Sequence, residues 1–154
     1  MLENDAKVNQ AANDGMTPLF HAVICRHVDV VRLLVESGAN TNEVTRACVT
    51  PFSVACRLGC AEIARVMLES GGADVDFVVT QGRTVLFLAC QRGCVDVARC
   101  LLENDADVDR SNENGATPLH IACENGDMDA VRLLLEYDAT TNQADDDGNS
   151  PLYW

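Results

Sequence analysis

The chain has 154 residues, with 24 acidic against 11 basic side chains and a formal net charge of −13 at pH 7. This balance disfavours a nucleic acid partner, because such binding depends on neutralising phosphates with a basic surface. Apolar runs are far shorter than the roughly 20 residues that cross a bilayer, and the start Met1–Asp5 lacks a signal-peptide pattern, so we expect no membrane insertion and an intracellular location, cytoplasmic or nuclear.

A short motif recurs along the chain. Its copies begin at residues 17, 50, 84, 117 and 150, so the successive offsets are 33, 34, 33 and 33 residues. The copies read Thr17-Pro18-Leu19-Phe20, Thr50-Pro51-Phe52-Ser53, Thr84-Val85-Leu86-Phe87, Thr117-Pro118-Leu119-His120 and Ser150-Pro151-Leu152-Tyr153. A period of this length is typical of a solenoid, in which one short unit buries its apolar face only against its neighbours.

Each complete copy is followed by two patterns of apolar residues at i, i+3 and i+4, which predict two short helices per repeat. The motif Thr is a good N-cap, and Pro suits the first helical turn. Glycine separates the two helices at Gly59, Gly93 and Gly126. We expect the second helices to end near Gly38, near Gly71-Gly72, and at Asp105 and Asp138.

These features resemble the ankyrin repeat family over nearly the whole chain. The resemblance implies an all-α fold, a solenoid of helix-loop-helix repeats with β-hairpin fingers. Three residues depart from the family pattern: Arg26 stands where the family has glycine between the helices, Cys48 replaces a finger glycine, and Val85 replaces proline. The second repeat also has one extra residue, so we expect any departure in hairpin geometry chiefly in the second finger.

The repeats divide the chain into consecutive parts of a single domain. These parts are a partial repeat tail (1–12), repeats one to four (13–45, 46–79, 80–112 and 113–145) and a truncated fifth repeat (146–154). The segment Leu2–Asn9 reads like the repeat tail Leu102–Asp109, and Trp154 falls inside a first helix. Solenoids normally need terminal repeats with a polar outer face, so we interpret the chain as a monomeric segment of a longer chain.

Eight cysteines raise the question of a metal site. Cys56, Cys90 and Cys123 each follow the motif by the same interval, at a slot where the resemblance implies a small buried residue, and cysteine acts there as a small hydrophobe. The alternative is a pair of zinc half-sites, Cys56 with Cys60 and Cys90 with Cys94, but each pair straddles a helix end and zinc needs four converging ligands. We expect no metal, no cofactor and free thiols.

Catalytic groups are equally sparse. Cys25 and His21 could form a nucleophile pair on one helix, but the sequence supplies neither an oxyanion site nor a glycine-rich phosphate loop. His120 fills a Thr-Pro-Leu-His motif, where the resemblance implies hydrogen bonding between neighbouring loops. We therefore expect no catalytic residue and no enzyme activity.

A regular stripe of charge runs along the second helices, with Asp, Arg and Glu at fixed intervals, as in Asp29, Arg32 and Glu36. Acids suit the helix N-terminus, and these spacings place the charges on one solvated face. We interpret the stripe as structural.

The repeats differ from one another at the positions where the resemblance implies that partners bind, namely the finger tips and the exposed face of the first helices. The predicted partner-binding residues are Met16, Ile24, Arg46, Arg57, Leu58, Arg83, Gln91, Arg92, Glu113, Glu124 and Asn125. This surface is apolar in repeat one, basic in repeats two and three, and acidic in repeats four and five. Drift on a surface without a partner is the alternative explanation.

We therefore predict a non-catalytic scaffold for protein–protein interaction, with a concave binding surface of finger loops and first helices and a protein partner of unknown identity. The rival prediction is a structural spacer within a longer repeat array.

Overall fold

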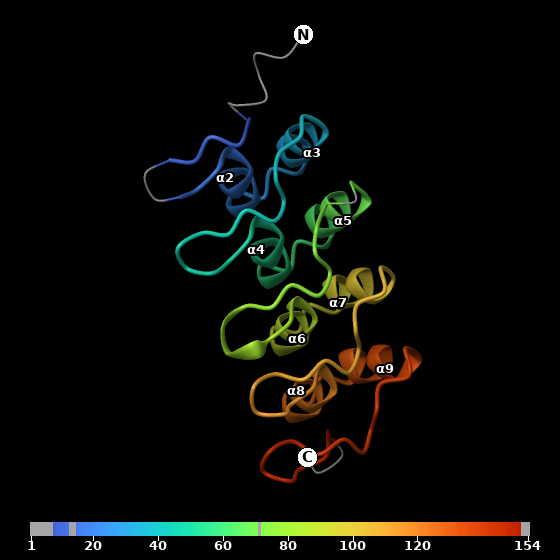
Figure 1. The fold of residues 1–154 in the computed structure, drawn as a ribbon. Coiled ribbons are helices and arrows are strands. Elements are labelled where there is room, and N and C mark those ends of the chain that lie inside the picture. Colours follow the sequence, from blue (N-terminus) through green and yellow to red (C-terminus); the bar gives the residue numbers. More distant parts are fainter. Residues whose placement is uncertain (1–7, 13–14, 71, 152–154) are drawn as a thin grey trace. The chain divides into compact units, whose positions relative to one another are not determined.

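The structure is a computed structural model that describes residues 8–12, 15–70 and 72–151 (Figure 1). The chain divides into two compact units, Met1–Asp74 and Val75–Trp154, and each is described by itself. The helices of the first unit are α2 (Pro18–Ile24), α3 (Val28–Glu36), α4 (Pro51–Arg57) and α5 (Ala61–Glu69). The second unit contains a 3₁₀ turn, η1 (Thr80–Gly82), followed by α6 (Val85–Gln91), α7 (Val95–Leu102), α8 (Pro118–Glu124) and α9 (Met128–Glu136).

The motif threonines begin the first helices as predicted. The hydroxyl oxygens of Thr17, Thr50 and Thr84 accept the N–H of the residue three positions later, at 3.3, 3.0 and 3.1 Å. At Thr50 and Thr117 the N–H of the cap residue also donates to the side chain three positions later, to Oγ of Ser53 at 2.9 Å and to Nδ1 of His120 at 3.0 Å. These threonines are buried, so the caps satisfy polar groups that water does not reach.

A left-handed residue joins the two helices of every repeat. Gly59, Gly93 and Gly126 have φ between 66° and 71°, and Arg26 takes the same conformation at 57° although it carries a side chain. The Arg26 guanidinium also donates from Nη2 to the carbonyl of Leu58 at 3.1 Å. The missing glycine therefore does not change the path of the chain.

The helices pack in pairs, and the pairs stack. In the first unit α2 contacts α3 and α4, while α5 contacts α3 and α4. In the second unit α6 contacts α7 and α8, while α9 contacts α7 and α8. Within each unit the first helices lie on the side of the fingers and the second helices on the other side (Figure 1). The apolar faces predicted from the sequence form the core between them, with Phe52, Ile63, Leu86, Leu101 and Leu134 among the most buried side chains.

The first, second, fourth and fifth fingers share one hydrogen-bond pattern. In the second finger the N–H of Thr45 donates to the carbonyl of Val49 at 3.0 Å, and the N–H of Cys48 donates to the carbonyl of Thr45 at 3.0 Å. The same pair of bonds occurs in the first, fourth and fifth fingers, where glycine stands in place of Cys48. Cys48 adopts the left-handed conformation of those glycines, with φ of 55°, so the second finger keeps the common geometry.

The departure lies in the third finger instead. There the N–H of Val79 donates to the carbonyl of Arg83 at 2.9 Å, as expected, but Thr80–Gly82 form a 3₁₀ turn in which Gln81 also has a positive φ of 65°. An isolated antiparallel bridge joins Val78 to Thr84 at the base of this finger.

In the part of the chain that the structure describes, the regular elements are all helical. The predicted all-α repeat fold, with hairpin-like fingers, is confirmed. The predictions for Leu2–Lys7, for Gly71 and for Leu152–Trp154 concern residues outside the described ranges.

Candidate partner-binding site

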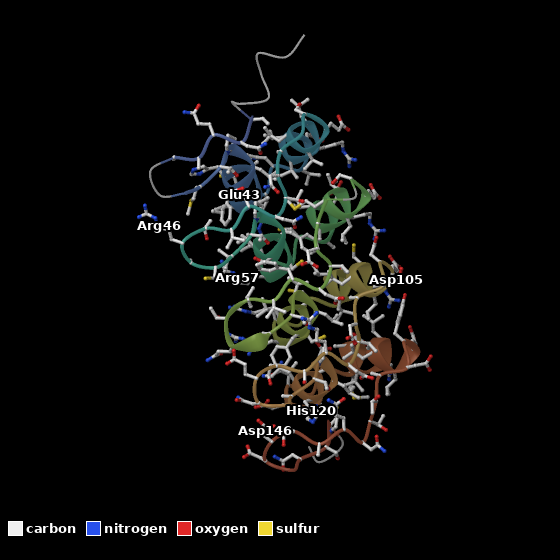
Figure 2. The ribbon with its side chains drawn as sticks, in the orientation of Figure 1. Glu43, Arg46, Arg57, Asp105, His120 and Asp146 are labelled. Carbon is white, nitrogen blue, oxygen red and sulfur yellow. The ribbon has the colours of Figure 1, made fainter. Side chains whose placement is uncertain are left out.

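In the first unit, the predicted site residues occupy the first two fingers and the ends of α2 and α4. Ile24 ends α2 with 44% of its surface exposed, while Met16 in the first finger is half-buried. Figure 2 shows Arg46 on the second finger, directed away from the helices of its unit, and Arg57 at the end of α4. Leu58 follows as the half-buried C-cap of α4.

In the second unit, Arg83 is the best-positioned predicted residue. It is half-buried at the base of the third finger, where Nε donates to the carbonyl of Thr80 at 3.3 Å and Nη2 approaches the Thr80 hydroxyl at 3.5 Å. Its Nη1 donates to Oε1 of Gln91, a half-buried residue at the end of α6, at 3.4 Å. Two elements therefore hold one guanidinium in place.

The remaining predicted residues of this unit are exposed. Arg92 caps α6, Glu124 ends α8, and Asn125 caps α8, where its Nδ2 donates to the carbonyl of Gln91 at 3.3 Å. Glu113 lies on the fourth finger. Arg46 and Arg57 belong to the first unit, and Arg83 and Arg92 to the second, so the continuous basic patch expected from the sequence stays a prediction.

A hollow of about 290 Å³ brings several of these residues together within the second unit. Arg83, Gln91 and Glu124 line it, as predicted. The other walls come from the fingers, α6 and α8. Gln81, Asn114, Ala116, Asp145 and Asp147 are finger residues, where partner contacts were expected, whereas Phe87, Asn112, His120 and Ile121 were not predicted. Phe87 on α6 is buried, with 4% of its surface exposed, and Ile121 on α8 is half-buried.

The fingers of the second unit are joined by backbone hydrogen bonds. The N–H of Glu113 donates to the carbonyl of Gln81 at 3.2 Å, and the N–H of Asp146 donates to the carbonyl of Asn114 at 3.0 Å. A Cβ on Gly82 would lie 2.8 Å from the nitrogen of Glu113, too close for any other residue to fit without displacing the fourth finger. The third, fourth and fifth fingers therefore form one connected rim above the hollow.

His120 links the fourth repeat to the fifth finger (Figure 2). Because Nδ1 accepts the N–H of Thr117, the ring proton is on Nε2, which donates to the carbonyl of Asn149 at 3.1 Å. The side chain is buried, with 4% of its surface exposed. The predicted role of His120, hydrogen bonding between neighbouring loops, is confirmed.

The fifth finger is shaped by a carboxylate. Oδ1 of Asp145 accepts the N–H of Asn149 at 2.8 Å and that of Asp147 at 3.0 Å. These bonds favour the charged form, so the N–H of Asn149 above all holds the pKa of the Asp145 carboxyl below its ordinary value. Asp145 is thus committed to the finger, whereas the carboxylates of Asp147 and Glu124 have no hydrogen bond or ion pair among the described residues.

The cysteines are distributed between core and surface. Cys56, Cys90 and Cys100 are buried, Cys123 is half-buried, and Cys25 and Cys48 are exposed. Burial raises the pKa of the Cys90 thiol to about 12, so it stays protonated and packs as a hydrophobe. Over the described ranges, no group of three or more His, Cys, Asp or Glu residues is arranged to hold a metal ion.

The charged stripe lies on the second helices, away from the hollow. An ion pair joins Arg99 on α7 to Glu136 on α9 at 3.9 Å, and another joins Arg132 to Asp129 within α9 at 3.8 Å. Both pairs are largely exposed, so each contributes at most about 1 kcal/mol. No helix in the described part of the chain is both long and apolar enough to cross a membrane.

The segments of the chain that match known proteins coincide with the repeats described above. Residues 86–135 match the family model described as ankyrin repeats (many copies), and residues 14–46 and 49–79 match the ankyrin repeat model. Protein phosphatase 1 regulatory subunit 27 of Homo sapiens is 39% identical over 62 residues, which is 40% of each chain. The Caenorhabditis elegans ankyrin repeat and KH domain-containing protein mask-1 is 32% identical over 111 residues, 71% of this chain and 4% of the relative.

A third relative is ankyrin repeat protein nuc-2 of Neurospora crassa, which is 30% identical over 64 residues, 42% of this chain and 6% of that protein. The chain therefore spans between 4% and 40% of the lengths of these three relatives.

Proposed function

Because the chain belongs to the ankyrin repeat family, whose repeats are generally protein–protein interaction modules, we propose that it is a non-catalytic module that binds a protein partner through its finger loops and first helices. The observation that carries this proposal is the hollow of the second unit, lined by three fingers and two first helices. Its walls combine a cation, carboxylates, amides and three apolar side chains, a mixture suited to recognising another polypeptide.

The mechanism is rigid display. The fingers of the second unit are tied to one another by backbone hydrogen bonds and to α8 by His120. A surface held in this way loses little conformational entropy when a partner binds, so more of the interaction free energy contributes to affinity. The human relative is named as a regulatory subunit, and a regulatory subunit acts through the protein it binds, which is the mode of action proposed here.

The predicted binding residues include side chains of both units, each considered within its own unit. Met16 and Ile24 would supply apolar contacts in the first repeat, and Arg46 and Arg57 would supply basic contacts in the second. The residues around the hollow would supply the contacts of the third and fourth repeats. We further propose that the repeats form a single domain and that the protein acts inside the cell. The alternative function, a spacer within a longer array, needs none of these exposed side chains.

The two functions are separated by capturing partners with this chain from a lysate and repeating the capture with Arg57→Glu plus Arg92→Glu. Both residues are exposed at the ends of first helices, so the substitution should leave the fold intact and remove a specific partner. Arg32→Glu plus Arg132→Glu is the matched control, because it makes the same change of charge on the exposed face of second helices.

A captured partner that is lost with the first variant and kept with the control supports recognition through this surface. Its association should also slow as salt rises, since exposed charges are screened beyond a Debye length of about 8 Å at physiological ionic strength. Failure of the chain to retain any partner in a reproducible way would favour the spacer. A partner retained equally by both variants, with an association rate insensitive to salt, would move the site to the apolar residues Met16 and Ile24.

A further inference from the structure

The hollow of the second unit has a fixed order of charge. The hydrogen bonds between fingers place the fourth finger between the third and the fifth. Arg83 lines the hollow from the third finger, the neutral Asn112 and Asn114 from the fourth, and Asp147 from the fifth, with Glu124 on α8. Arg83 and Asp147 thus lie on either side of the fourth finger, and the hollow is positive at the third finger and negative at the fifth finger and at the end of α8.

The positive end lacks an anion. Arg83 is half-buried, and a guanidinium stays charged at any physiological pH. Its described contacts are neutral oxygens, from Thr80 and Gln91, at 3.3 to 3.5 Å. These contacts are long for hydrogen bonds of a cation, which are normally about 2.7–2.9 Å when the acceptor is a carboxylate. The guanidinium is thus oriented but not neutralised, and a carboxylate would be its strongest partner.

The negative end lacks a cation. Asp145 directs its oxygens to the backbone of its own finger, whereas Asp147 and Glu124 have carboxylates without a described partner. Between the two ends, the half-buried Ile121 contributes apolar surface from α8, while Phe87 on α6 lines the hollow with only 4% of its surface exposed. The volume, about 290 Å³, is at the lower edge of the range for small-molecule pockets. A few side chains of a peptide would occupy it.

We propose that this hollow binds an extended peptide segment that places an acidic side chain against Arg83, an apolar side chain against Ile121, and a basic side chain against Glu124 and Asp147. The inference rests on the proposed function and adds the chemistry of the partner. A peptide with charges of one sign only would bring like charges together at one end of the hollow, so both charges are needed for binding.

The test uses fluorescent peptides that carry one Asp and one Arg on either side of a Leu, at increasing separation and in both orders. Binding to the whole chain is measured by fluorescence polarisation. Peptides that carry both charges should bind, and those with two charges of the same sign or with Asn and Gln in place of the charged residues should bind about tenfold more weakly or worse, the equivalent of losing about 1.4 kcal/mol.

Arg83→Glu should abolish binding of the preferred peptide and restore binding to a peptide with Lys in place of its Asp. Arg83→Gln, which removes the charge with a smaller change of structure, should give a partial loss if Arg83→Glu proves unstable by circular dichroism. Arg132→Glu, on the exposed face of α9, is the control and should bind like the wild type.

Equal binding of charged and uncharged peptides, or no effect of either Arg83 variant, would overturn the inference. So would a complete absence of binding to any peptide of the set. The captured partner distinguishes this failure from failure of the proposed function: a partner that is lost with Arg57→Glu plus Arg92→Glu but retained with Arg83→Glu leaves the interaction module in place and removes only the peptide site.

Discussion

Asp109 and Thr140, 31 residues apart, are joined by two hydrogen bonds. Oδ1 of Asp109 accepts the N–H of Thr140 at 2.8 Å, and Oδ2 accepts its hydroxyl at 2.6 Å. The same relationship recurs one repeat earlier, where Oδ1 of Asp76 accepts the N–H of Asp107 at 3.0 Å. In the first unit the side chains of Asn9 and Asn42 accept the corresponding N–H groups. An Asx side chain thus ties the tail of each repeat to the tail of the next.

We expect Asp109→Ala to destabilise the chain by about 1–3 kcal/mol, because a hydrogen bond to a charged group contributes about 1.5–3 kcal/mol and Asp109 is half-buried. Asp109→Asn should cost less, since its amide oxygen still accepts the N–H of Thr140. Urea unfolding followed by circular dichroism measures both changes. Glu136→Ala, an exposed residue in a weak ion pair, is the control, and equal stability of Asp109→Ala and this control would contradict the prediction.

Much of the fold follows from the sequence because local chemistry and repeat packing agree. Thr17, Thr50 and Thr84 form the predicted caps, and the predicted helix ends at Asp105 and Asp138 are left-handed residues with φ of 63° and 60°. Arg26 and Cys48 were expected to disturb the pattern. They do not, because the backbone hydrogen bonds on both sides set their φ at a modest cost in strain, with the Cys48 side chain exposed and the Arg26 guanidinium donating to the carbonyl of Leu58.

The third finger shows why the rest was not predictable. Its sequence matches the repeat better than that of the second finger, yet Gln81 takes a left-handed conformation beside Gly82. The carbonyl of Gln81 accepts the N–H of Glu113, a contact between residues far apart in the chain that no local pattern encodes. Helical periodicity likewise does not tell which residues of α6 and α8 line the hollow, where Ile121 is half-buried and Phe87 is 4% exposed.

The exposed finger residue Cys48 offers a route to higher stability. A side chain in the left-handed region costs about 1–2 kcal/mol, and replacing it with glycine removes this strain. Part of the stabilisation is offset because glycine also makes the unfolded chain more flexible. We expect Cys48→Gly to raise the free energy of unfolding by about 0.5–1 kcal/mol, measured as a shift of the urea midpoint. Ala47→Gly, next to it and with no positive φ, should lower stability; a loss in both variants would show that Cys48 is not strained.

The cysteines should react in two groups. Cys25 and Cys48 are exposed, whereas Cys56, Cys90 and Cys100 are buried, and a thiol must be accessible and deprotonated to react. We expect Cys25 and Cys48 to be labelled first by a thiol reagent in the native protein, and all eight to be labelled under denaturing, non-reducing conditions. Fewer than eight would indicate a disulfide. A chelator should leave the melting curve unchanged, and a collapse on chelation would overturn the assignment of these cysteines to the core.

Acid should loosen the fifth finger. The folded state lowers the pKa of Asp145 below its value in the unfolded chain, chiefly through the N–H of Asn149. For a carboxyl whose folded pKa is depressed, the stabilisation is fully present above the unfolded pKa of about 3.9, and it is lost as the pH falls through the folded pKa. The contribution of Asp145 therefore disappears in strongly acidic solution and is intact at neutral pH.

Asp145→Asn tests this pH dependence, because an amide oxygen can accept the same N–H groups but does not titrate between neutral and acidic pH. We expect the stability of this variant to fall less steeply below about pH 4 than that of the wild type, in urea titrations at a series of pH values. Asp147→Asn, which removes a neighbouring carboxylate without a described side-chain bond, should follow the wild-type curve. If the stability of wild type and Asp145→Asn fell identically at acidic pH, the carboxylate of Asp145 would not hold the finger. Glu124 and Asp147 would then be the only carboxylates that contribute to the negative end of the hollow.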